Sequence, residues 1–145
     1  DVSFEGSTPA ASVDGLQSNK WQHVMFATPA GQFLYCVNGV DSARYYDGLN
    51  WVIPAISGVS SDTLINIVAH KFRLWFVQAG TTDLWYLPSS SIAGEAVKFP
   101  VGALFSQGGY VEVLGIYSYD AGTGMDDLLF AWSSEGEVGR NEAGN

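Results

Sequence analysis

Apolar and aromatic residues occur in short runs along the chain, separated by turns rich in Gly, Pro, Asn and Asp. β-Branched and aromatic residues fill the runs, and no 11-residue window shows the period of a helix. Turn residues recur about every 8 to 12 positions, which is typical of an all-β domain. We expect strands at Trp21–Thr28, Gln32–Val37, Ala43–Tyr46, Trp51–Ile53, Thr63–His70, Arg73–Gln78, Leu84–Leu87, Ala96–Phe99, Tyr110–Tyr119 and Asp127–Trp132.

The pattern of these runs repeats. Phe33–Gly39 aligns with Arg73–Ala79 at a spacing of 40 residues, and Tyr45–Asp47 aligns with Trp85–Leu87 at the same spacing. Repeats of about 40 residues made of short strands are typical of propellers and stacked sheets. The matched positions are expected to pack alike in each unit; they are Leu34 and Leu74, Tyr35 and Trp75, and Tyr45 and Trp85.

A third, diverged unit is expected over the last strands. A closed propeller has four to eight blades, so about three units predict a partial propeller or an open stack of sheets. The stretch before the first strand is rich in Ser, Gly and Pro. The predicted organisation is an extended arm at 1–19, a β-repeat domain at 20–138 and a polar tail at 139–145.

Charged residues are scarce: they make up 14% of the 145 residues, against 47% for hydrophobic residues. Either other protein chains cover part of the surface, or Gly- and Ser-rich loops and a net charge of −9 keep it in solution. The 15 acidic residues outnumber 6 basic ones that form no cluster, so specific nucleic-acid binding is not expected. Such an acidic surface would let DNA pass nearby without holding it.

Membrane, redox and catalytic functions find no support in the sequence. No apolar run approaches the roughly 20 residues of a membrane-spanning helix, so no membrane span is expected. Cys36 is the only cysteine and lies in an apolar run, which favours a buried thiol. No nucleophile elbow, phosphate-binding glycine loop or paired Cys and His is present. We therefore expect neither an enzyme nor a bound cofactor.

The loop between Tyr119 and Asp127 is the strongest candidate for a metal site. Asp120, Asp126 and Asp127 lie around two glycines and could supply carboxylate oxygens to calcium. The stretch lacks the Glu that ends the twelve-residue calcium loop. We therefore favour a hairpin loop whose aspartates bond to the backbone of their own turns.

The aromatic residues allow two interpretations. An exposed shelf of rings would stack against sugars and make this chain a carbohydrate-binding module. Packing between neighbouring sheets is favoured instead, because several rings fall on repeated positions and aromatic side chains bury the most surface. The residues concerned are Trp21, Tyr35, Trp51, Trp75, Trp85, Tyr86 and Trp132.

Several short motifs follow one another in order between residues 21 and 138. They are Val37–Asp41, Tyr46–Gly48, Phe72–Val77, Trp85–Pro88, Ile92–Gly94, Phe99–Gly102, Gly108–Tyr110, Gly122–Asp127 and Ser134–Val138. The ordered set resembles the large virion structural proteins of tailed bacteriophages, of the propeller-containing tail-connector or nozzle type. The polar stretch after Val138 departs from that pattern, where another aromatic strand is expected.

The resemblance implies a structural virion component without catalytic residues. Such a protein would assemble as a homo-oligomeric ring at the head–tail junction or along a short tail, in contact with other virion proteins. We therefore expect a virion location and a function in protein–protein assembly. The alternative that remains open is a carbohydrate-binding module with exposed aromatic side chains.

Overall fold

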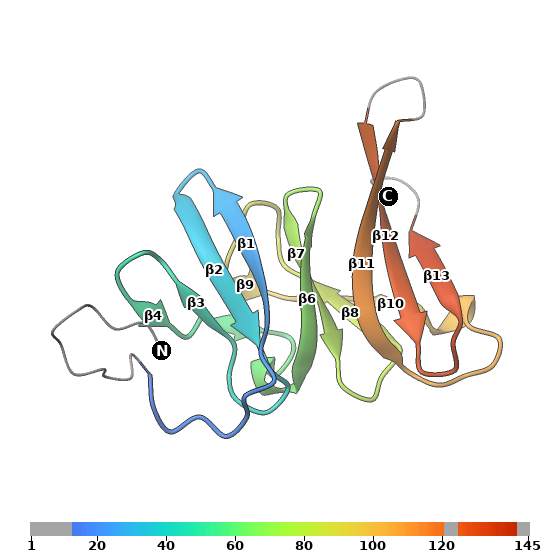
Figure 1. The fold of residues 1–145 in the computed structure, drawn as a ribbon, viewed down its shortest axis with the longest axis horizontal. Coiled ribbons are helices and arrows are strands. Elements are labelled where there is room, and N and C mark those ends of the chain that lie inside the picture. Colours follow the sequence, from blue (N-terminus) through green and yellow to red (C-terminus); the bar gives the residue numbers. More distant parts are fainter. Residues whose placement is uncertain (1–12, 121–124, 142–145) are drawn as a thin grey trace, which may run out of the picture.

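The computed structural model describes residues 13–120 and 125–141, with side chains for 13–118 and 127–140. It confirms an all-β fold: three antiparallel sheets follow one another in chain order and stand side by side (Figure 1). The described residues form no helix long and apolar enough to cross a membrane; their two helical segments are single 3₁₀ turns, Ser61–Thr63 and Gly102–Leu104.

Each sheet is a short antiparallel meander whose strands pair in the order in which they occur along the chain. The first sheet holds β1 (Gln22–Thr28), β2 (Gly31–Val37), β3 (Arg44–Tyr46) and β4 (Trp51–Val52). The second holds β6 (Leu64–His70), β7 (Arg73–Gln78), β8 (Asp83–Tyr86) and β10 (Val97–Pro100). The third holds β11 (Val111–Asp120), β12 (Met125–Ser133) and β13 (Val138–Asn141), and a small parallel pair joins β5 (Ile56–Ser57) to β9 (Gly94–Glu95).

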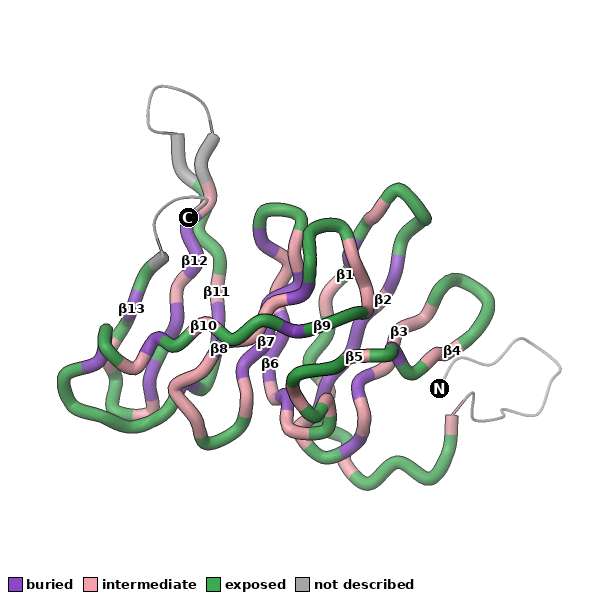
Figure 2. Tube along the Cα trace, turned by 180° about the vertical axis from the view of Figure 1, so that it is seen from behind, coloured by how far each residue is buried: buried purple, intermediate pink, exposed green. Residues whose placement is uncertain are grey.

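The sheets fan out from their first strands, as the blades of a propeller do. Strand β6 contacts β1 on one side and β11 on the other, so the first strand of every sheet lies at a common inner edge. The second sheet is therefore packed between the other two and buries both of its faces. Buried residues accordingly lie on strands of all three sheets, while the connecting loops are largely exposed (Figure 2).

Two apolar cores lie between these sheets. The first core joins Tyr35 and Val37 of the first sheet to Leu74 and Phe76 of the second. The second core joins the opposite face of the second sheet to the third, and its members are Trp75, Val77, Leu84, Val101, Phe105, Val111, Leu114, Leu129 and Ala131. Residues that alternate along β7 thus enter different cores, as the two-residue period of a strand requires.

The β6–β7 hairpin turns at Lys71 and Phe72, the two residues between its strands. Both residues have positive φ angles, 47° and 61°, as a two-residue hairpin turn of the type I′ class requires. Neither is a glycine or asparagine, so the turn places two ordinary side chains in the left-handed region. The Phe72 side chain is 76% exposed and gains little from packing in return.

The C-terminal end of the domain differs from the sequence expectation. The polar tail predicted from residue 139 begins as a strand, because β13 continues to Asn141 and Gly139 and Arg140 pair with Ala131 and Phe130 of β12. Backbone pairing needs no apolar side chain, and Gly139 suits the place: a Cβ there would lie 3.2 Å from Leu104 Cδ1. The described part of the predicted arm, 13–19, contains no strand.

Candidate assembly surface

Each sheet carries a cross-strand row of three side chains on corresponding faces. In the first and second sheets, this is the face that packs on the following sheet. The pairing registers define the rows: Tyr35 pairs with Val24 and Tyr45, Trp75 with Val68 and Tyr86, and Trp132 with Val113 and Val138. Every row thus places a valine on the first strand and an aromatic residue on the second. We call them the first row (Val24, Tyr35, Tyr45), the second row (Val68, Trp75, Tyr86) and the third row (Val113, Trp132, Val138).

The first two rows are covered by the next sheet. Tyr35 is fully buried in the first core, and its hydroxyl donates to the Ile92 carbonyl at 3.0 Å. Burial, and next the nearby Tyr45, raise the pKa of Tyr35 far above its usual range, so the phenol keeps its proton. Trp75 is 7% exposed in the second core, with its ring 4.8 Å from that of Tyr86.

No sheet among the described residues covers the third row. Val113, Trp132 and Val138 are 40%, 37% and 52% exposed, although the matching positions in the other two sheets are buried at Tyr35 and Trp75 and partly buried in the rest of each row. The Trp132 ring lies across β11 at Gly115, where a Cβ would meet Trp132 Cζ3 at 2.8 Å. Its centroid is 5.9 Å from that of Phe130.

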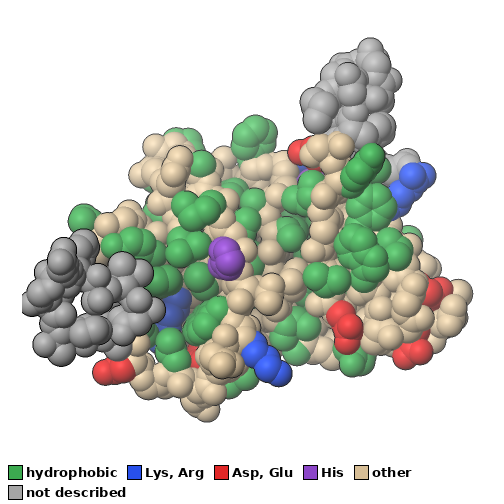
Figure 3. Space-filling model, in the orientation of Figure 1, with side chains coloured by type: hydrophobic (Ala, Val, Ile, Leu, Met, Phe, Trp, Pro, Cys, Tyr) green, Lys and Arg blue, Asp and Glu red, His purple; other side chains and the backbone are tan. Residues whose placement is uncertain are grey.

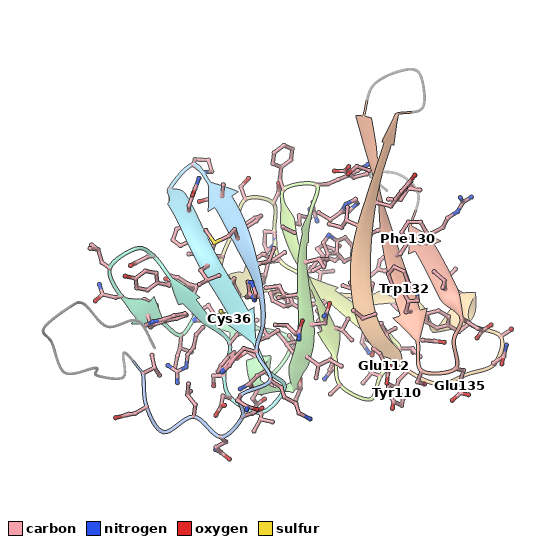
Figure 4. The ribbon with its side chains drawn as sticks, in the orientation of Figure 1. Cys36, Tyr110, Glu112, Phe130, Trp132 and Glu135 are labelled. Atoms are coloured by element: carbon pink, nitrogen blue, oxygen red, sulfur yellow. The ribbon has the colours of Figure 1, made fainter. Side chains whose placement is uncertain are left out.

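The third row is part of a wider apolar surface. Tyr117 and Phe130 lie on the same face of the third sheet, by the same pairing register. Figure 3 shows hydrophobic side chains gathered over β12 and β13, in the region where Figure 4 labels Phe130 and Trp132. Tyr117 is 60% exposed. Contiguous apolar surface of this kind marks a site of interaction.

The opposite end of the stack also has an open face. The back face of the first sheet points away from the second sheet and carries Met25, Leu34 and Tyr46 in one row of paired residues. Met25 is 59% exposed and Leu34 partly exposed, whereas Leu74 on the matching face of the second sheet is fully buried. The first sheet covers Leu74; among the described residues no sheet covers Leu34 in the same way.

The predicted packing positions divide into two groups. Leu34 and Leu74 lie on corresponding faces of their sheets, and so do Tyr35 and Trp75. Tyr45 and Trp85 do not correspond: Tyr45 belongs to the first row, while Trp85 pairs with Phe76 and faces back toward the first sheet. The counterpart of Tyr45 is Tyr86, because the second unit has one more residue before its third strand.

Sequence reasoning missed the third row as a repeat of the first two. Trp132 follows Trp75 by 57 positions rather than 40, because the β11–β12 hairpin is longer than the earlier ones. A valine on the preceding strand and a tryptophan on the returning strand are the signal that could have found it. That signal is short, and only the pairing register shows that its members lie side by side.

In the first sheet region and in the third, one carboxylate accepts hydrogen bonds from a segment distant in sequence. Glu137, next to Val138, accepts hydrogen bonds from the Ser106 hydroxyl at 2.6 Å and from the Ser106 and Gln107 N–H groups at 2.9 Å. These bonds, that from the Ser106 side chain above all, hold the pKa of Glu137 below its usual range. Asp41 binds the Gln17 and Ser18 N–H groups, and its pKa is lowered, chiefly by the Asn38 side chain.

A hollow of about 590 Å³ lies beside the back face of the first sheet. Its lining residues are Val13, Asp14, Arg44, Tyr46, Leu49, Asn50 and Trp51. The rings of Tyr46 and Trp51 are 5.3 Å apart, and the buried Nε of Arg44 has no hydrogen-bond partner among the described residues. Aromatic rings beside amide and guanidinium hydrogen-bond donors can bind a polar ligand that stacks one face against a ring and accepts hydrogen bonds at its edge.

The predicted calcium loop falls largely outside the described residues. The strands reach Asp120 and Asp126, whose backbones pair with Met125 and Tyr119, but only Asp127 has a described side chain. Elsewhere in the described part of the chain, no three His, Cys, Asp or Glu side chains gather in an arrangement that could hold a metal ion.

Comparison with known proteins adds no assignment to this geometry. No protein-family model, curated protein or solved structure matches the chain. The open third row and the open back face of the first sheet are therefore the features from which a function has to be argued.

Proposed function

We propose that this chain is a non-enzymatic building block of a larger protein assembly, and that the assembly is the tail, connector or nozzle of a tailed bacteriophage. The observation that carries the proposal is the third row. A row of residues that packs against the next sheet twice within the chain, with its central aromatic ring buried each time, occurs a third time on an open face. A protein surface that repeats an internal packing surface is built to be covered by another sheet.

The phage setting is supported by the ordered motifs that resemble virion proteins, and by the charge of the chain. Only 6 of 145 residues are basic, and the net charge is −9. Phosphates are held by Lys and Arg, so this surface would not retain DNA that moves past it. A virion component beside the path of the DNA needs that property.

The test is the presence of the chain in purified particles. Particles from the producing culture are banded on a density gradient, washed in 1 M salt (about a 3 Å screening length), and quantified by mass spectrometry with isotope-labelled peptides. We expect a fixed copy number per particle, because apolar contacts survive high salt. A chain that is found only as free monomer in the soluble fraction would overturn the proposal.

Variants connect this test to the surface. Trp132→Glu places a charge in the third row and should exclude the chain from particles. Val97→Glu is the matched control, since Val97 is 43% exposed on the outermost strand of the second sheet, away from both open faces. Normal incorporation of both variants would show that the third row is not the assembly surface.

Carbohydrate binding is the second candidate, favoured by one observation. The Tyr46 and Trp51 rings line the hollow together with Asn50 and Arg44, which supplies both stacking faces and hydrogen-bond donors. A glycan array, followed by titration of tryptophan fluorescence in the wild type and in Trp51→Ala, decides this candidate. Binding that Trp51→Ala removes supports it, and silence across the array rejects it.

A further inference from the structure

We propose that the partner of each open face is a second copy of this chain, bound head to tail, so that two chains close one ring of six sheets. The third row of each copy would pack on the back face of the first sheet of the other. This inference rests on the proposed assembly function and names its partner. It concerns the chain alone in solution, so it can fail while the assembly function stands.

The two open faces are the two halves of a contact that the chain already makes twice. The second sheet covers the first row with its back face, which carries Leu74 and Phe76. The third sheet covers the second row with its own back face, which carries Leu114 and Leu129. Among the described residues, the third row lacks a back face to cover it, and the back face of the first sheet lacks a row. A head-to-tail contact supplies both at once.

The chemistry of the two faces fits this pairing. Met25, Leu34 and Tyr46 on one side would meet Val113, Trp132 and Val138 on the other. None of these six residues is charged, although the chain carries 15 acidic residues. The pairing registers place Arg44 on the face of Leu34 and Tyr46, and Arg140 on the face of Phe130 and Trp132, so each apolar row has an arginine beside it. The net charge of −9 keeps the remaining surface from associating at random.

The number of sheets in a closed propeller favours a ring of two copies of this chain. A contact between unlike faces forms either a closed ring or an open filament. Closed propellers have four to eight blades. The described residues of one copy form three such sheets, so two copies supply six, whereas three copies would supply nine, outside that range. Strands β1, β6 and β11, the first of each sheet, lie next to one another (Figure 1) and would line the inside of such a ring.

Light scattering on the eluting chain tests the number of copies. We expect a mass of twice 15.6 kDa, unchanged over a tenfold dilution in the micromolar range. A mass of one chain throughout would overturn the inference. A mass that rises steadily with concentration would also overturn it, because it indicates an open filament.

Charge variants test which faces meet. Leu34→Glu and Trp132→Glu should each give monomers, while the control Val97→Glu stays dimeric. In a mixture of the two monomeric variants, one intact contact remains between unlike faces. The mixture should therefore form two-chain species at concentrations where each variant alone stays monomeric. Monomers in the mixture, or loss of the dimer in only one of the two variants, would overturn the head-to-tail arrangement.

Folding of the variants is checked independently. Met25→Glu and Val138→Glu change the two most exposed members of the pairing, 59% and 52%, and should reproduce the effects of Leu34→Glu and Trp132→Glu. Circular dichroism and thermal melting report whether each variant keeps its sheets. A monomeric variant that melts like the control has lost the contact and not the fold.

Discussion

Tyr35 and Trp132 hold the same position in their sheets, each on the second strand and in the middle of a cross-strand row, yet Tyr35 is fully buried and Trp132 is 37% exposed. The difference arises from what lies next to each sheet. The second sheet covers Tyr35, and no described element covers Trp132. An aromatic residue at a position that is buried in the first sheet is thus partly exposed to solvent in the third sheet.

Trp75 and Trp132 should respond differently to truncation. Trp75→Ala removes a ring that is 7% exposed in the second core, so we expect a loss of about 3–5 kcal/mol in the free energy of unfolding. Trp132→Ala removes a ring that is partly in water, and we expect about 1–2 kcal/mol in the monomer. Urea unfolding in dilute solution measures both. Equal losses would show that Trp132 is already covered.

Asn66 joins the second sheet to the third by a buried hydrogen bond. Its Oδ1 accepts the Leu114 N–H at 3.2 Å, at places where both β6 and β11 are irregular in register. Asn66→Ala leaves that N–H without a partner, which should cost about 1–3 kcal/mol. Hydrogen exchange at Leu114 is the local measurement. Unchanged protection of this amide would contradict the role given to Asn66.

Phe72→Gly should stabilise the protein. Phe72 has a φ of 61° and is 76% exposed, so glycine removes a steric cost and forfeits little packing. The expected gain is about 1 kcal/mol, or an increase of roughly 2–4 °C in melting temperature. Phe72→Ala, which keeps the Cβ, is the control and should not show this gain. A lower melting temperature for the glycine variant would contradict the prediction.

Glu137 should make the third sheet sensitive to acid. Its folded pKa lies below the unfolded one because of its bonds to Ser106 and Gln107. The stability that it contributes is therefore complete above about pH 4.3 and is lost as pH falls through the folded pKa. Glu137→Gln should be less stable than the wild type at pH 7 and equally stable at the acid end. Glu135→Gln, in the same turn, is the control; a pH-independent difference for Glu137→Gln would contradict this role.

The all-β class and the hairpins could be predicted, because alternating aromatic and β-branched residues and Gly- and Pro-containing turns are local signals. The matching faces of Leu34 and Leu74 followed from the aligned motifs, because Leu34 and Leu74 take the same place relative to Tyr35 and Trp75 on strands β2 and β7. Trp85 could not be placed in this way. Tyr35 pairs with Tyr45 ten residues later and Trp75 with Tyr86 eleven later, and a change of one residue reverses the face.

The open third row was harder to foresee for a different reason. Burial depends on which sheet lies next to a residue, and Trp132 looks like any core tryptophan in the sequence. The strand at Gly139–Asn141 was also missed, because its pairing uses only backbone groups and its side chains carry no apolar pattern. Contacts made by the backbone and by neighbouring sheets leave little trace in a single sequence.

Hydroxyl-radical footprinting of Trp75 and Trp132, read by mass spectrometry across protein concentrations, shows whether the third row is the contact surface. Trp75 should be protected at every concentration, whereas Trp132 should react in solutions dilute enough to separate the chains and become protected as the chains associate. If Trp132 stays equally reactive while light scattering shows association, the third row is not the surface through which this protein assembles.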